Sequence, residues 1–286
     1  MSPPFHRIAI LGLGLMGGCI ALESKKRRLA RKIVAYNRSA SRRQWAKKKG
    51  WCQEVYADPR KAVLGADLVV LATPVKKIPR LAETIAGDLQ AGALVTDVGS
   101  TKGMIVKELD RILPRDVQFV GGHPIAGREK TGIESAIPGL FEDRWWIFTP
   151  GPRRPGSGKA LTRLRRWAQD MGAKTTTMTP AEHDQCLALI SHLPHMVAYA
   201  LVDSALKVKG GKNLRFAAGG FRDFTRIAGS SPQMWAEICL DNQKFLLQMM
   251  ERYEKSLGRI RQLIKRGDEK ALTQLFAKAA QARKQL

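Results

Sequence analysis

The chain has 286 residues, a length that suits two domains, and its apolar fraction of 44% is ordinary for a globular protein. Its 49 lysines and arginines against 25 acidic residues give a formal charge of +24, yet no helix-turn-helix, zinc-finger or RNA-binding aromatic pattern accompanies them, so nucleic-acid binding is not expected. The four cysteines are far apart and form no C-x-x-C pair, so neither a disulfide framework nor a zinc finger is indicated, and a reducing compartment is favoured.

A glycine fingerprint follows the first predicted strand. Gly12, Gly14 and Gly17 form G-x-G-x-x-G directly after the strand-like run 7–11, and an apolar run, 33–36, follows at the spacing of a βαβ unit. The first glycine allows a tight turn, the second lets backbone amides approach a pyrophosphate, and the third lets the helix pack on the strand. The spacing predicts a dinucleotide-binding domain of the Rossmann type.

Leu15 and Met16 lie inside this fingerprint and are expected to border the cofactor. Residues 8–22 also have the apolar character of a signal peptide, but their glycine spacing favours the dinucleotide site. No run reaches the ~20 uninterrupted apolar residues of a membrane helix. We therefore expect a cytoplasmic protein with no membrane partner.

The end of the second predicted strand indicates which cofactor is bound. Asn37 stands where a carboxylate would accept from the adenosine ribose hydroxyls and repel a 2′-phosphate. Arg38 and Ser39 follow it, with Arg42 and Arg43 behind, and they offer donors and positive charge. These residues favour NADP over NAD; in the alternative, the arginines form only a solvated helix face and NAD is accepted as well.

Further strand-like runs at regular intervals predict a doubly wound α/β sheet covering residues 1–150. They span residues 68–71, 94–97, 119–121 and 145–148. Thr73 and Pro74 follow the first of these runs at the carboxyl end of a strand, where ligands bind in such sheets, and are expected to contact the cofactor.

Residues 151–286 are predicted to form an all-α second domain. A breaker-rich segment, 151–158, separates it from the sheet. Residues 179–182 have the pattern of a capping box that starts a helix reaching residue 209, bent near Pro194. Helices are also expected from Pro232 past residue 253 and from Asp268 to the end. Their apolar stripes exceed what three helices can bury, which predicts a homodimer.

Chemistry is expected at two places where the sheet ends. His123 lies between two glycines and Pro124, residues that hold the backbone in one place, so its imidazole is a candidate general base. Ser100 follows the strand 94–97 and is positioned either to hydrogen-bond nicotinamide and substrate or to cap the next helix.

Two further constellations lie in the helical half. His192 and His195 are three residues apart on one helix face; His183 and Cys186 nearby make zinc conceivable, but no recognisable ligand spacing completes a site and no metal is expected. Asp223 and Arg226 sit among glycines and aromatics, where they either pair with each other at a helix junction or present Arg226 to a carboxylate.

Five segments in this order closely resemble the prephenate and arogenate dehydrogenases of tyrosine biosynthesis. They are residues 12–18 (GLGLMGG), 97–102 (DVGSTK), 121–127 (GGHPIAG), 191–195 (SHLPH) and 220–226 (GFRDFTR). The resemblance implies a Rossmann domain, a helical dimerisation domain, and the oxidative decarboxylation of a cyclohexadienol dicarboxylate.

The resemblance also implies roles for single residues. His123 matches the catalytic histidine, Ser100 the serine between hydroxyl and cofactor, and Arg226 the carboxylate anchor. His195 and His192 are expected to complete the anionic pocket, with Glu129 at its rim and Asp223 orienting the arginine.

The substrate is expected to be prephenate, because a second cationic donor at His195 suits a keto-acid side chain. Glu129 is able to pair with the ammonium of arogenate, so arogenate or dual use remains an alternative. A related NADP-dependent hydroxyacid dehydrogenase, which would share the glycine fingerprint, and a nucleic-acid-binding protein are the other classes considered.

Overall fold

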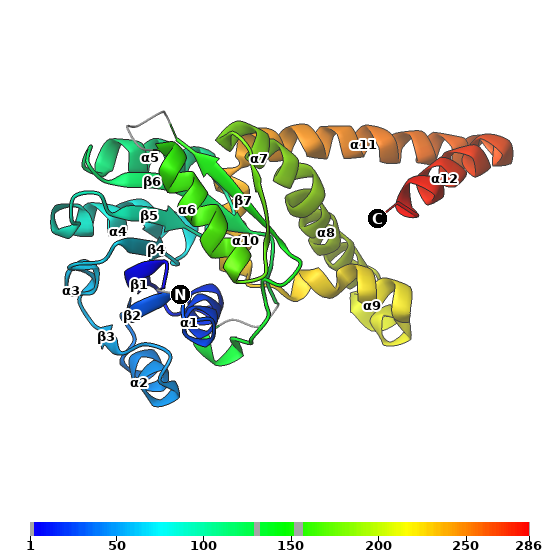
Figure 1. Cartoon of the computed structure of the whole chain (residues 1–286). Coiled ribbons are helices and arrows are strands. Elements are labelled where there is room, and N and C mark those ends of the chain that lie inside the picture. Colours follow the sequence, from blue (N-terminus) through cyan, green and yellow to red (C-terminus); the bar gives the residue numbers. More distant parts are fainter. Residues whose placement is uncertain (1–2, 129–131, 152–156, 286) are drawn as a thin grey trace.

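The computed structural model describes residues 3–128, 132–151 and 157–285, in which one sheet is followed by a group of helices (Figure 1). Eight strands form the sheet in the order β3-β2-β1-β4-β5-β6-β7-β8, and all neighbours are parallel except β6 and β7. The strands are β1 (Phe5–Leu11), β2 (Ala30–Tyr36), β3 (Glu54–Tyr56), β4 (Leu68–Leu71), β5 (Leu94–Asp97), β6 (Gln118–Pro124), β7 (Trp145–Pro150) and β8 (Lys174–Thr177).

Helices cover both faces of this sheet. One face carries α1 (Leu15–Lys26), α2 (Ala40–Lys49) and α6 (Ser157–Asp170), and the other carries α3 (Pro59–Val63), α4 (Ile78–Ile85) and α5 (Gly103–Ile112). Among the short turns, η3 (Ile133–Ser135) packs on the first face through Ile133 and η1 (Val75–Lys77) on the second through Val75, while η2 (Ala86–Asp88) follows α4. The predicted doubly wound α/β fold is confirmed.

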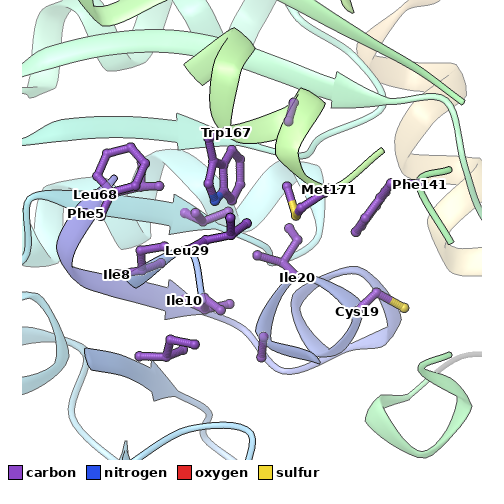
Figure 2. Packing of buried hydrophobic residues seen from close by; sticks show 14 of the residues in the cluster. Phe5, Ile8, Ile10, Cys19, Ile20, Leu29, Leu68, Phe141, Trp167 and Met171 are labelled. Atoms are coloured by element: carbon purple, nitrogen blue, oxygen red, sulfur yellow. The ribbon is translucent and has the colours of Figure 1, made fainter. Parts of the chain in front are cut away.

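Successive side chains of β1 point to opposite faces of the sheet, so the core has two halves, one on each face. Ile8 and Ile10 face the first group of helices, whereas Ala9 and Leu11 face the second. Figure 2 shows Trp167 of α6 over the β1 side chains, so α6 belongs to the core of the sheet.

The sheet continues past residue 150, where we expected the first domain to end. After β7 the chain forms α6 and then β8, which pairs in parallel with β7. β8 consists of Lys174 and three threonines, so the prediction that residues 151–286 are all-α is wrong for Lys174–Thr177. We therefore use "sheet domain" for residues 3–177 and "helical domain" for residues 180–285.

The helical domain begins at the predicted capping box. The Thr179 hydroxyl accepts from the Glu182 N–H, and the Glu182 carboxylate accepts from the Thr179 N–H. The helix then runs as α7 (Pro180–Leu187), a π-helical turn η4 (Ala188–His192) and α8 (Leu193–Lys207). Residues 180–207 have the length and hydropathy of a membrane-crossing helix, but the buried polar groups described below identify them as the helix that joins the two domains.

Most of the rest of this domain extends away from the sheet, although α10 (Pro232–Asp241) lies beside it (Figure 1). The other elements are η5 (Lys209–Phe216), α9 (Gly219–Thr225), η6 (Arg226–Gly229), α11 (Gln243–Arg266) and α12 (Glu269–Arg283). The side chains of Ser231 and Asp268 cap α10 and α12, so both helices begin where the sequence predicts a helix start. The long helix expected after Pro232 is interrupted at Asn242, whose side chain turns into the interior.

Candidate active site

The carboxyl ends of β1 and β4 form a cradle for a dinucleotide. Gly12 has a φ of +114°, and a Cβ there would lie 2.5 Å from the Ala72 carbonyl oxygen. A Cβ on Gly17 would lie 1.9 Å from the Gly12 carbonyl oxygen, so only glycine lets α1 approach the strand this closely. Around Gly14 the space is open, as an approaching pyrophosphate requires.

Thr73 supports this assignment of the cradle. Its Oγ1 atom is buried and has no hydrogen-bond partner within the part of the chain that the structure describes. Such an atom fits a group that hydrogen-bonds to a ligand. Pro74, next to it, precedes η1, while Leu15 and Met16 begin α1 and pack against the core. The residues present therefore fit a dinucleotide cofactor.

At the end of β2 some polar residues form hydrogen bonds within the loop, which we call the loop scaffold, and others face outward. Asn37 is buried and its Oδ1 accepts from the Ser39 N–H at 2.9 Å. The Arg43 guanidinium donates to the Asn37 and Arg38 carbonyl oxygens at 2.8 and 2.9 Å, so it holds this loop together. Arg38 is exposed and Arg42 partly exposed, which leaves these two arginines for an anionic group.

A chain of hydrogen bonds leads from His123 into the helical domain. His123, near the end of β6, has its Nδ1 2.8 Å from Nε2 of His183. His183 in turn has its Nδ1 2.8 Å from Oδ1 of Asp184, and both α7 residues are buried. We call these three residues the histidine relay.

The relay determines which nitrogen of each ring carries a proton. Because the Asp184 carboxylate only accepts, His183 donates from Nδ1 and its Nε2 keeps a lone pair. That lone pair accepts from Nδ1–H of His123, so Nε2 of neutral His123 carries a lone pair. An imidazole held in this tautomer is suited to remove a proton.

The surroundings keep His123 neutral. Burial lowers the pKa of His123 well below its usual value, and the Lys102 ammonium and the neighbouring titratable rings of His183 and His192 lower it further. Burial also lowers the pKa of His183, although Asp184 opposes that shift. The base is therefore in its proton-accepting form at neutral pH.

His192 belongs to the same buried cluster, but its Nε2 is a hydrogen-bond donor, whereas Nε2 of His123 is an acceptor. The Asn242 side-chain amide donates to the Asp184 backbone carbonyl at 2.7 Å and to Nδ1 of His192 at 3.0 Å. Since Nδ1 accepts, neutral His192 carries its proton on Nε2 and is a donor there. Burial lowers its pKa to about 4, so it stays neutral.

His195 stacks on Trp235 of α10, with ring centroids 3.6 Å apart. Its Nδ1 donates to the Ser191 carbonyl at 2.9 Å, which leaves a lone pair on Nε2 of the neutral ring. Desolvation lowers the pKa of His195, with the Ser191 carbonyl opposing. At neutral pH the ring is thus an acceptor rather than the cationic donor expected from the sequence.

Ser100 lies three residues after β5 and is partly buried. Its position at the carboxyl edge of the sheet is shared with Thr73 and His123. The first helical residue of α5 is Gly103 and its N-cap is Lys102, so Ser100 does not cap this helix. Its contact with cofactor and substrate stays a prediction.

Arg226 and Asp223 lie on the surface of the helical domain, outside the buried histidine relay. Asp223 is on α9 and Arg226 begins η6, and both are exposed. The two elements pack against α8, and the Tyr199 hydroxyl of α8 donates to the Ser230 carbonyl at 3.1 Å just after η6. The arginine is therefore accessible beside the helix that carries His195. Glu129 lies outside the described residues.

The site also contains residues that the sequence did not identify. His183 entered only as a zinc candidate, yet both of its ring nitrogens are engaged by the histidine relay and neither is available to a metal. Within the described ranges no group of three or more His, Cys, Asp or Glu residues is arranged to hold a metal ion. Asp184 and Asn242 had no motif to mark them, because both are polar residues inside helical patterns.

Comparisons with known proteins agree with this geometry. Two family models match: "Prephenate dehydrogenase, nucleotide-binding domain" over residues 20–177 and "Prephenate dehydrogenase, dimerization domain" over residues 179–278. The division between them falls directly after β8.

Two curated relatives span nearly the whole chain. A prephenate dehydrogenase of Bacillus subtilis is 37% identical over 95% of this chain and 74% of its own length. A cyclohexadienyl dehydrogenase of Zymomonas mobilis is 33% identical over 98% and 95%.

A solved structure shows the same arrangement of both domains. Prephenate dehydrogenase from Aquifex aeolicus, in complex with hydroxyphenyl propionate and NAD+, matches with a TM-score of 0.90 and 34% identity over 97% of each chain. The chain belongs to the prephenate/arogenate dehydrogenase family of NAD(P)-dependent oxidoreductases.

Proposed function

We propose that this protein oxidatively decarboxylates prephenate to 4-hydroxyphenylpyruvate, with hydride transfer to NADP. The observation that carries the proposal is the histidine relay, which presents the Nε2 lone pair of His123 at the carboxyl edge of the sheet. The cofactor cradle around Gly12 and Thr73 lies on the same edge. A base and a dinucleotide at one edge are what oxidation of an alcohol requires.

His123 carries out the proton chemistry. Its Nε2 accepts the ring hydroxyl proton while a nicotinamide, when bound in the cradle, supplies the hydride acceptor for the same carbon. The ring carbonyl that results lets the carboxylate at the opposite ring carbon leave as CO2, with its bonding electrons delocalised to the carbonyl oxygen. The ring becomes a phenolate, and the His123 imidazolium returns the proton to its oxygen. Protons therefore balance without release to solvent.

We assign Arg226 as the anchor for a substrate carboxylate. Replacing it by alanine removes a bidentate charge-assisted contact that is worth about as much in the ground state as in the transition state. KM for prephenate should rise about 100-fold, with kcat changed less than about threefold. Arg80→Ala, which removes an exposed guanidinium from α4, is the matched control. An equal fall in kcat with unchanged KM would contradict the assignment.

The cofactor preference is assigned to Arg38 and Arg42, since Arg43 is engaged in the loop scaffold. The unmodified protein should have a lower KM for NADP than for NAD, because a 2′-phosphate gains charge-assisted contacts. Arg38→Ala should raise the KM for NADP about tenfold and leave that for NAD unchanged. Lys47→Ala on α2 serves as the control. A clear preference of the unmodified protein for NAD would overturn this assignment.

One observation favours arogenate as a second substrate. Neutral His195 presents a lone pair on Nε2, which accepts from an ammonium more readily than it binds a keto acid. Turnover of prephenate and arogenate at pH 7.5 should be compared through kcat/KM. A higher value for prephenate supports the proposal, and a higher value for arogenate identifies the amino acid as the preferred substrate.

We further propose that the protein acts as a homodimer in the cytoplasm. Its four cysteines are free thiols, which suits a reducing compartment. The helical domain leaves large apolar side chains exposed: Leu201, Leu206, Val208, Phe216, Phe224, Leu247, Leu257, Ile264 and Phe276. A second copy of this domain would cover them. A monomeric mass by light scattering at micromolar concentration would refute the dimer.

A further inference from the structure

Two fully buried charges lie beneath the candidate active site, and the reaction as described uses neither. Lys102, the N-cap residue of α5, and Asp97, the last residue of β5, are both 0% exposed. Their side chains form an ion pair. Burying two charges carries a large desolvation cost, so the pair calls for a reason beyond stability.

The pair holds the backbone directly before His123. The Lys102 ammonium donates to the Gly122 carbonyl at 2.8 Å, and Asp97 Oδ1 accepts from the Gly122 N–H at 3.1 Å. The N–H and the C=O of Gly122 are thus both hydrogen-bonded to the ion pair. A Cβ on Gly122 would lie 2.8 Å from the Asp97 carbonyl oxygen, so a glycine is needed for this close approach.

The main chain of the same lysine is bound from the other domain. Asp184 accepts from the Lys102 N–H at 2.8 Å and from the Gly103 N–H at 2.7 Å. It thereby caps α5, whose own N-cap side chain makes no capping bond. Because Asp184 also holds the histidine relay, the hydrogen bonds form a closed ring. They run from His123 through the relay to Lys102, and from its ammonium back to the residue before His123.

We propose that Lys102, paired with Asp97, is a positioning residue for the base: it fixes the peptide that carries His123 and holds a positive charge behind the imidazole. This inference rests on the proposed role of His123 as the general base. Lys102 acts through the histidine and does not touch the substrate.

The positive charge of Lys102 affects the protonation of His123. A fixed cation disfavours the imidazolium, so it extends the pH range in which His123 is a free base toward acid. Burial lowers the pKa of Lys102, and the carboxylates around it oppose that shift and favour the ammonium. The charged and titratable groups facing His123 or Lys102 from the neighbouring elements are His183, His192, Asp97, Asp184 and Asp241.

The test compares the unmodified protein with Lys102→Met and with Lys102→Met/Asp97→Asn. Loss of the cation should move the acid limb of the kcat profile upward by about one pH unit, because the nearby positive charge no longer opposes protonation. On the alkaline plateau kcat should fall about tenfold, since Gly122 loses its donor. Lys107→Met, an exposed lysine on α5, should leave both unchanged.

The same shift should appear without substrate. The chain has five histidines, so NMR titration of nitrogen-15-labelled protein can follow His123 directly in each variant. This measurement remains informative even if prephenate is not turned over, and so separates failure of this inference from failure of the proposed function.

The double variant covers the case in which Lys102→Met does not fold. It leaves no unpaired buried charge, and the side-chain amide oxygen that Asp97→Asn retains can still accept from the Gly122 N–H. A fall in kcat in the folded variants with the acid limb and the His123 titration unchanged would reduce Lys102 to a structural role and overturn the proposal.

Discussion

His123→Asn should lower kcat by two to four orders of magnitude, because the substituted side chain cannot accept the ring hydroxyl proton; this is the usual contribution of about 10²- to 10⁴-fold from a general base. The fold and the affinity for the dinucleotide should be retained, since His123 pairs with β7 through its backbone and the cofactor cradle lies on other strands. Single-turnover kinetics, with the nucleotide Kd measured in parallel, check both statements.

His6→Asn is the matched control for that experiment. His6 is an exposed histidine on β1, and its replacement should leave kcat unchanged. Near-normal turnover by His123→Asn would remove the assignment of this residue as the base.

Asp184→Asn should lower kcat by about 10²- to 10³-fold through the tautomers of the histidine relay. A carboxylate accepts from His183 Nδ1–H and from the two N–H groups at the start of α5, whereas an amide must direct its own N–H₂ at one of these donors. If the amide nitrogen faces His183, that ring is protonated on Nε2 and opposes Nδ1–H of His123. The base then carries its proton on the nitrogen that should accept.

Two measurements separate this effect from simple unfolding. The thermal midpoint of Asp184→Asn reports the loss at the α5 N-terminus, and NMR of the histidine rings reports the tautomer of His123. Asp203→Asn, an exposed aspartate of α8 paired with Lys207, is the control. A variant with native tautomers and native kcat would show that the relay does not orient the base.

Local patterns in the sequence account for much of the fold. The spacing of Gly12, Gly14 and Gly17 reflects steric demands that act within a few residues, and the structure has a close contact at the first and third and open space at the second. The capping box at Thr179 is equally local. By contrast, the breaker-rich segment 151–158 suggested a domain boundary, while Trp167 and the threonine strand β8 join the sheet through contacts distant in sequence.

The candidate site likewise contains residues that local sequence patterns mark and residues that they do not. His123 was identifiable because glycines and proline adjoin it, but His183 contacts it from 60 positions away, and no local spacing encodes that contact. Asn242 interrupts a helix without glycine or proline because its amide is bound by Asp184 and His192. For Arg43 the sequence suggests a contact with a cofactor phosphate, whereas in the structure its guanidinium is hydrogen-bonded to backbone carbonyls of the loop scaffold.

We expect His123 to support an oxidation that is coupled to decarboxylation. The most direct measurement is the stoichiometry of purified protein with prephenate and NADP. Reduced nucleotide, CO2 and 4-hydroxyphenylpyruvate should appear in equal amounts, at a kcat of about 1 to 10³ s⁻¹ that falls in His123→Asn. Reduced nucleotide formed without CO2, or oxidation of small 3-hydroxy acids with prephenate and arogenate both inert, would contradict it.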